Sequence, residues 1–130
     1  MTSSRDDIPA HLRRFLEENI DTVPQLETLL MMYGKPDRGW LIAEVATRNY
    51  ITEQRATETL SSLQRRGLVT AEGSPPHFRF NPANGDVHAL VAELVLCYQR
   101  KLSAVTELIH AKPSASVKEF ARAFDLKKDR

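Results

Sequence analysis

The sequence has little of what several protein classes require. It contains one cysteine, Cys97, which excludes an intramolecular disulfide and a thiolate-rich zinc site. No stretch approaches the roughly 18 apolar residues that a membrane-spanning helix needs. The first residues also lack the basic start and apolar run of a secretory signal. We therefore expect a cytoplasmic protein with no membrane partner, in agreement with the low cysteine content.

Residue patterns typical of catalysis and metal binding are also missing. The four histidines, His11, His77, His88 and His110, have no metal-ligand spacing such as His-x-x-x-His, and the chain has no glycine-rich phosphate loop. Cys97 lies in an apolar stretch with no basic residue immediately before it, which favours a buried structural thiol over a nucleophile. The sequence predicts no catalytic residues, no metal site and no cofactor.

Charge is nearly balanced, with a net value of +1 over 130 residues. It is uneven along the chain, because residues 1–37 carry −3 whereas residues 38–80 and 81–130 carry +2 each. Neutralisation of phosphates supplies most of the nonspecific affinity for DNA. This mild basic excess permits DNA binding but does not argue for it.

Length and an apolar fraction of 42% indicate one compact domain with appended helices.

Periodicity and capping residues predict a mainly α-helical chain. Residues 1–37 are expected to form two N-terminal helices, over about 7–20 and 22–34, that pack on the core. Pro9 and Pro24 fall in the first turns of these helices, where proline is tolerated.

Residues 38–82 have the pattern of a helix-turn-helix followed by a small β-hairpin, or wing. Thr52 is a typical helix N-cap, Gly67 is a typical helix stop, and Gly73-Ser74-Pro75-Pro76 has the composition of a turn. The expected elements are a short helix over 41–48, a turn over 49–51, a second helix over 52–66, and strands over 68–72 and 77–81.

This segment resembles the winged helix-turn-helix of bacterial transcriptional regulators, in the broad MarR-like and PadR-like sense. Asn49 and Tyr50 depart from the family pattern, since these regulators usually have an apolar residue and a glycine there, and Leu41 stands where a Ser or Thr cap is common. The resemblance implies a DNA-binding regulator of transcription. The residues that carry it are Ala46, Ile51, Leu60, Leu63, Gly67, Leu68 and Val69.

In this family the second helix of the motif enters the major groove and the wing reaches the backbone or the minor groove. Carried over to this chain, the resemblance assigns contacts with double-stranded DNA to Gln54, Arg55, Thr57, Glu58 and Ser61 on the second helix, with Arg65, His77 and Arg79 on phosphates. Glu53 and Glu58 would repel phosphate, unless Glu58 accepts a hydrogen bond from cytosine. The alternative is a polar helix face that is only solvated.

Residues 83–112 are predicted to form one long helix whose apolar face is wider than one small core covers. We expect this face to form a homodimer seam, which would present two recognition helices to half-sites about one DNA turn apart. The alternative is a helix buried within its own domain. The residues expected in the seam are Val87, Val91, Leu94, Tyr98, Leu102, Val105 and Ile109.

Residues 113–130 are predicted to form a short amphipathic helix with a basic tail, because Ser116 and Glu119 have capping-box spacing. This helix would dock on the core or bind a protein partner in a groove. An alternative function follows for the whole chain: a winged-helix interaction module that binds a protein through the long helix and the C-terminal segment, without contacting DNA.

Overall fold

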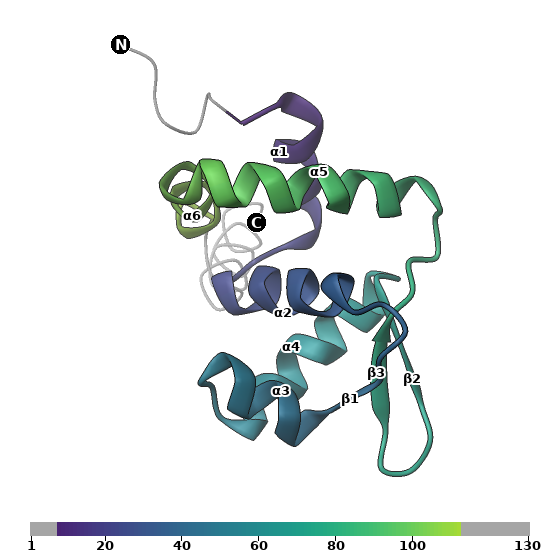
Figure 1. The fold of residues 1–130 in the computed structure, drawn as a ribbon. Coiled ribbons are helices and arrows are strands. Elements are labelled where there is room, and N and C mark those ends of the chain that lie inside the picture. The colour runs from purple at the N-terminus through teal and green to yellow at the C-terminus, as the bar shows by residue number, and fades with distance from the viewer. Residues whose placement is uncertain (1–7, 113–130) are drawn as a thin grey trace, which may run out of the picture.

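The computed structural model describes residues 8–112, and in this part of the chain a small antiparallel sheet lies at one edge of a body of helices (Figure 1). The helix predicted over 113–130 lies outside the described residues. The predicted fold class, mainly α-helical with a β-hairpin wing, is confirmed. The elements are α1 (Ala10–Asn19), α2 (Val23–Gly34), β1 (Trp40–Leu41), α3 (Ile42–Asn49), α4 (Glu53–Arg65), β2 (Val69–Glu72), β3 (His77–Phe80), α5 (Asp86–Arg100) and α6 (Leu102–His110).

The sheet has the strand order β1-β3-β2, with both pairs antiparallel. The two strands of the predicted hairpin are present, and Val69 lies opposite Phe80 in their register. The third strand, β1, was not predicted. It has two residues and pairs Trp40 with Phe78, a contact between distant segments that a short-range alternation pattern does not contain.

Helix α2 lies at the centre of the core. It contacts α3, α4, α5, α6 and β3, and the side chains of Leu26, Leu29 and Met32 are fully buried. The Thr22 hydroxyl accepts a hydrogen bond from the Gln25 backbone N–H at 3.2 Å; the sequence left Asp21 and Thr22 as alternative caps, and the structure has Thr22. Packing against this central helix positions the helix-turn-helix.

The helix-turn-helix consists of α3 and α4, as predicted. The Thr52 hydroxyl caps α4 by accepting from the Arg55 backbone N–H at 3.1 Å, and Gly67, at a φ of +73°, follows the end of the helix. One face of α4, formed by Ala56, Leu60 and Leu63, is fully buried. The opposite face of α4 therefore points away from the core.

The prediction of one long helix over 83–112 is wrong. The chain forms two helices, α5 and α6, and the backbone breaks at Lys101, where φ is −130° and ψ is 48°. Figure 1 shows α5 lying across the view while α6 is seen nearly end-on. The spacing of apolar residues continues across the break, and neither glycine nor proline occurs there. Periodicity alone therefore gave no sign of the bend.

The bend also corrects the predicted dimer seam. Val91 and Leu94 of α5 and Val105 and Ile109 of α6 are buried in the core of the chain itself, at exposed fractions of 0–1%. Turning α6 against α5 lets one core cover apolar residues that a straight helix would leave uncovered. These four residues have no surface to offer a second copy. Val87 and Tyr98 are half-buried, and Leu102 is 54% exposed.

An ionic cluster joins the α1–α2 junction to the ends of α4 and α6. The Asp21 carboxylate accepts from Arg66 at 3.1 Å and pairs with the Lys112 ammonium at 3.0 Å. That ammonium also donates to three carbonyl oxygens at the end of α1, at 2.6–3.2 Å. A positive charge is favourable at a helix C-terminus. The cluster therefore fixes both helix ends against the N-terminal helices.

A buried hydrogen bond holds the end of α3 to α2. The Asn49 side-chain amide donates to the Thr28 hydroxyl at 3.0 Å, and Thr28 has no exposed surface. A buried hydroxyl that loses its donor carries a desolvation penalty. This bond therefore fixes the chain at the start of the helix-turn-helix turn.

We expect Asn49→Ala to lower the free energy of unfolding by about 1–2 kcal/mol, because it removes this bond and leaves a buried oxygen without a donor. Urea denaturation of Asn49→Ala, Thr28→Val and the double variant measures the coupling, expected to be about 1 kcal/mol. Thr47→Ala, at an exposed position on the same helix, serves as the control and should change stability by less than about 0.5 kcal/mol. A coupling energy of zero would contradict the hydrogen bond between Asn49 and Thr28 as the cause.

Candidate nucleic-acid interface

The outward face of α4 gathers six of the eight residues that were predicted to contact DNA. Its apolar face is buried, so the polar residues of the same helix are displayed on the other side. The exposed residues are Gln54, Arg55, Thr57, Glu58 and Arg65, and Ser61 is half-buried. The structure places the remaining two, His77 and Arg79, on strand β3 of the wing.

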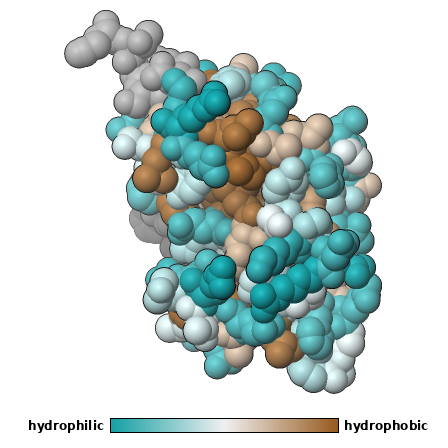
Figure 2. Space-filling model, viewed as in Figure 1, coloured by the Kyte–Doolittle hydropathy of each residue, from teal (hydrophilic) through white to brown (hydrophobic). Residues whose placement is uncertain are grey.

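The start of α4 and the tip of the wing lie at the same end of the molecule. In Figure 1 both are at the bottom of the view, whereas α1, α5 and α6 are at the top. The lower part of the surface is mostly hydrophilic (Figure 2). A ligand that spans the recognition helix and the wing would therefore meet polar groups and would not meet α5 or α6.

Two cationic side chains of α4, Arg55 and Arg65, have no hydrogen-bond or ion-pair partner within residues 8–112. Gln54 donates to Glu58 at 3.4 Å, and the Thr57 hydroxyl donates to the Glu53 carbonyl oxygen at 2.8 Å. In contrast, within residues 8–112 the Arg55 guanidinium has no hydrogen-bond or ion-pair partner. It needs no internal contact to be broken before it binds an anion or a base edge.

The wing carries charges of both signs. Arg79 donates to Glu72 on the neighbouring strand at 3.3 Å, and His77 is exposed directly opposite Glu72 in the register. The ion pair is exposed and is therefore weak in water. Arg79 would therefore lose little free energy if it left Glu72 to bind a phosphate.

Two exposed residues beside the recognition helix were not among the predicted contacts. Arg48 lies in the last turn of α3, and Tyr50 follows in the turn with 96% of its surface exposed. One feature of the sequence pointed to this turn: Tyr50 stands where the family that the chain resembles usually has a glycine. Its backbone indeed has the left-handed conformation, with φ at 56° and ψ at 43°.

Glu44 takes over the cap that Leu41 lacks at the start of α3. Its carboxylate accepts from the Leu41 backbone N–H at 2.8 Å and from Arg38 at 3.0 Å. The backbone hydrogen bond holds the pKa of Glu44 below its ordinary value, and Arg38 adds to the effect. The Arg38 guanidinium also lies 3.6 Å over the ring of Trp40. These contacts fix the junction of β1 and α3.

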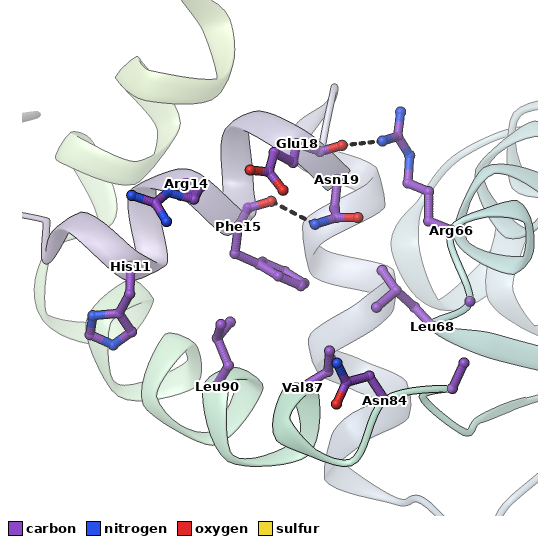
Figure 3. Close-up of a pocket in the computed structure, with 12 residues that line it drawn as sticks. His11, Arg14, Phe15, Glu18, Asn19, Arg66, Leu68, Asn84, Val87 and Leu90 are labelled. Atoms are coloured by element: carbon purple, nitrogen blue, oxygen red, sulfur yellow. Dashed lines mark hydrogen bonds between the residues drawn. The ribbon is translucent and has the colours of Figure 1, made fainter.

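A hollow of about 380 Å³ separates α1 and α5 from the end of α4 (Figure 3). Its apolar wall includes Phe15 and Leu90, and its rim includes His11 and Arg14. Arg66 crosses one side and donates to the Glu18 carbonyl oxygen.

The described residues also bear on membrane spans, metal sites and the reactivity of the thiol. None of the helices in residues 8–112 has the length and apolarity needed to cross a bilayer, and no group of three possible metal ligands occurs in that range. Cys97 is half-buried, and burial raises the pKa of its thiol. A raised pKa keeps the group protonated, as a structural thiol would be.

No family model and no curated protein matches the chain. Solved structures do. A mutant of MepR from S. aureus bound to an oligodeoxyribonucleotide has a TM-score of 0.53 at 15% identity, and the match covers 91% of this chain and 84% of that one. The transcriptional regulator MosR from M. tuberculosis gives 0.53 at 16% identity, over 92% and 86%. A MarR family transcriptional regulator from Silicibacter pomeroyi gives 0.51 at 19% identity, over 88% and 81%.

The chain has a MarR-like winged helix-turn-helix fold. The predicted resemblance is thereby confirmed at the level of the fold, which is what identities of 15–19% support. In the MarR-like fold of this chain, α3 and α4 form the helix-turn-helix and β2 and β3 form the wing. The DNA contacts assigned to single residues stay predictions.

We expect Glu44→Gln to lower the free energy of unfolding at pH 7 by about 0.5 kcal/mol, because the amide still accepts from Leu41 but the negative charge is lost. Because the pKa of Glu44 lies below its ordinary value, the carboxylate contributes stability above that ordinary value and loses it as the pH falls through the folded-state pKa. Urea denaturation should therefore show wild type and variant converging in stability as the pH falls well below the ordinary glutamate pKa. A difference in stability that stays constant from neutral pH into that acidic range would contradict this cause.

Proposed function

We propose that this chain is a transcriptional regulator that binds double-stranded DNA, with the outward face of α4 in the major groove and the wing on the flanking backbone. The observation that carries the proposal is the exposed polar face of α4, on which Arg55 has no partner within residues 8–112. Such a regulator acts where the bacterial chromosome lies, in the cytoplasm. The proposal assigns the chain no reaction and no cofactor.

The chemistry of the α4 face suits base edges. Arg55 can donate two hydrogen bonds to guanine, and Gln54 can pair with adenine once it releases its long bond to Glu58. Glu58 can accept from the cytosine amine, which turns an acidic residue into a specific contact. The hydroxyls of Thr57 and Ser61 can bond to bases or phosphates.

Residues at the edges of this face would hold the backbone. Arg65 at the end of α4, together with His77 and Arg79 on the wing, supplies the donors for phosphate contacts. The fold likeness supports DNA as the ligand, because MepR was solved with an oligodeoxyribonucleotide bound. The net charge of residues 38–80 is only +2. We therefore propose that base contacts contribute more to the DNA affinity of this chain than its overall charge does.

We expect the purified protein to bind genomic DNA fragments at low salt and to bind them more weakly at moderate salt. Arg55→Glu should weaken binding at least about tenfold, because it replaces a donor with a charge that phosphates repel. Arg14→Glu is the matched control: it makes the same charge change at an exposed residue of α1 and should bind like wild type.

Fluorescence anisotropy at the two salt concentrations measures these affinities. Failure of the wild type to bind at low salt would overturn the proposal and favour the protein-interaction module. If Arg14→Glu and Arg55→Glu lost the same amount of DNA affinity, the loss would come from the change in net charge and not from a contact made by α4.

We further propose that the protein acts as a homodimer through the outward side of α5 and the start of α6. Leu96 and Leu102 are exposed at 53% and 54%, and an apolar area lies over α5 in Figure 2. Exposed apolar area of this kind is typical of an interaction site. A two-fold pair would present two α4 helices to half-sites about one DNA turn apart.

We expect light scattering to give the mass of a dimer for wild type and of a monomer for the double variant Leu96→Glu, Leu102→Glu, since burying two carboxylates against a second copy is unfavourable. Lys35→Glu, at an exposed position after α2, is the control and should remain dimeric. A monomeric wild type at micromolar concentration would contradict the homodimer.

A further inference from the structure

Tyr50 ends α3 in the left-handed conformation of a helix C-cap, a position that glycine usually occupies, and its side chain is exposed. It is the only non-glycine residue with a positive φ in residues 8–112, and 96% of its surface is exposed. Left-handed backbone favours glycine, because a Cβ atom there approaches the following carbonyl oxygen. No hydrogen bond or ring contact involves the tyrosine side chain in this range. Glycine would remove both the strain and the exposed ring.

The turn that carries Tyr50 is held from both sides. On one side Asn49 donates to the buried Thr28, and on the other the Ile51 backbone N–H donates to the Ala46 carbonyl oxygen at 3.0 Å. Ile51 also packs against the hydrophobic core. The ring therefore projects from a fixed backbone, which lowers the entropy lost when it binds a ligand.

The position of Tyr50 favours DNA over a protein as that ligand. It lies two residues before Thr52, the cap of α4, and between the exposed cations Arg48 and Arg55. Figure 1 places the α3–α4 turn at the same end of the molecule as the start of α4 and the wing tip. Tyrosine hydroxyls are among the side-chain groups that bond to phosphate oxygens.

We propose that Tyr50 contacts the DNA backbone beside the recognition helix, with its hydroxyl donating to a phosphate oxygen and its ring against the neighbouring deoxyribose. This inference rests on the proposed function. It adds a contact from the turn of the motif to those from α4 and the wing. Because the hydroxyl is neutral, this contact releases no counterion and adds nothing to the salt dependence of binding.

The test compares Tyr50→Gly, Tyr50→Phe and Arg55→Glu with wild type. Tyr50→Gly should raise the thermal midpoint by about 2–4 °C, because it relieves the left-handed backbone. It should also weaken binding of genomic DNA fragments about three- to tenfold. Tyr50→Phe keeps the ring, so it should leave the midpoint unchanged and lose about two- to fivefold in affinity.

The salt dependence separates a neutral contact from an ionic one. The slope of log affinity against log salt should equal that of wild type in both Tyr50 variants and should be smaller in Arg55→Glu. A protein that becomes more stable and binds more weakly cannot have lost affinity through misfolding. A lower thermal midpoint in Tyr50→Gly would show a structural role and overturn the inference.

Further outcomes distinguish this inference from the proposed function. If wild type binds, Arg55→Glu does not, and Tyr50→Gly binds like wild type, the Tyr50 contact is overturned and the proposed function stands. If Tyr50→Gly keeps its DNA affinity but changes the mass measured by light scattering, the ring contacts a protein and the inference is overturned. If wild type does not bind DNA, both proposals fall.

Discussion

Burial of α2 is the constraint on which the rest of the structure depends. Leu26, Leu29 and Met32 are fully buried, and α2 contacts four other helices and β3. Burying each such side chain contributes about 1.5–3 kcal/mol, whereas an exposed ion pair contributes at most about 1 kcal/mol. Hydrophobic burial therefore decides where α3 and α4 pack, and the ion pairs refine the position. Helices α5 and α6 cover α2 on the side away from the motif, and α1 packs on α5 and α6 (Figure 1).

The same helix also fixes both ends of α4 through polar groups. Thr28 holds Asn49 and so the turn that precedes α4. At the start of α2, the Gln25 side chain accepts from the Asp21 backbone N–H at 2.7 Å, and the Asp21 carboxylate holds Arg66 at the end of α4. Buried polar groups need partners, and the Thr28 hydroxyl and the Gln25 side chain are both buried. The Asp21–Arg66 pair is partly exposed and refines the position. The orientation of α4 follows from the packing of α2.

Short-range signals in the sequence were sufficient for most elements. A helix cap or stop acts within four residues, so Thr52 and Gly67 marked helix ends that the structure confirms. The polar face of α4 followed from helical spacing in the same way. What escaped prediction depends on distant contacts. Strand β1 exists because β3 pairs with it, and the break at Lys101 exists because α6 turns onto the same core as α5.

The width of the apolar face over 83–112 has a different meaning once the bend is known. A straight helix with that face would need a second copy to cover it, whereas two helices at an angle cover one core from two directions. The apolar surface left outside is smaller and centres on Leu96 and Leu102. A smaller interface binds less tightly, because little apolar area remains to offset the entropy of association. Neighbouring half-sites on DNA would strengthen the proposed dimer further by holding two copies at high local concentration.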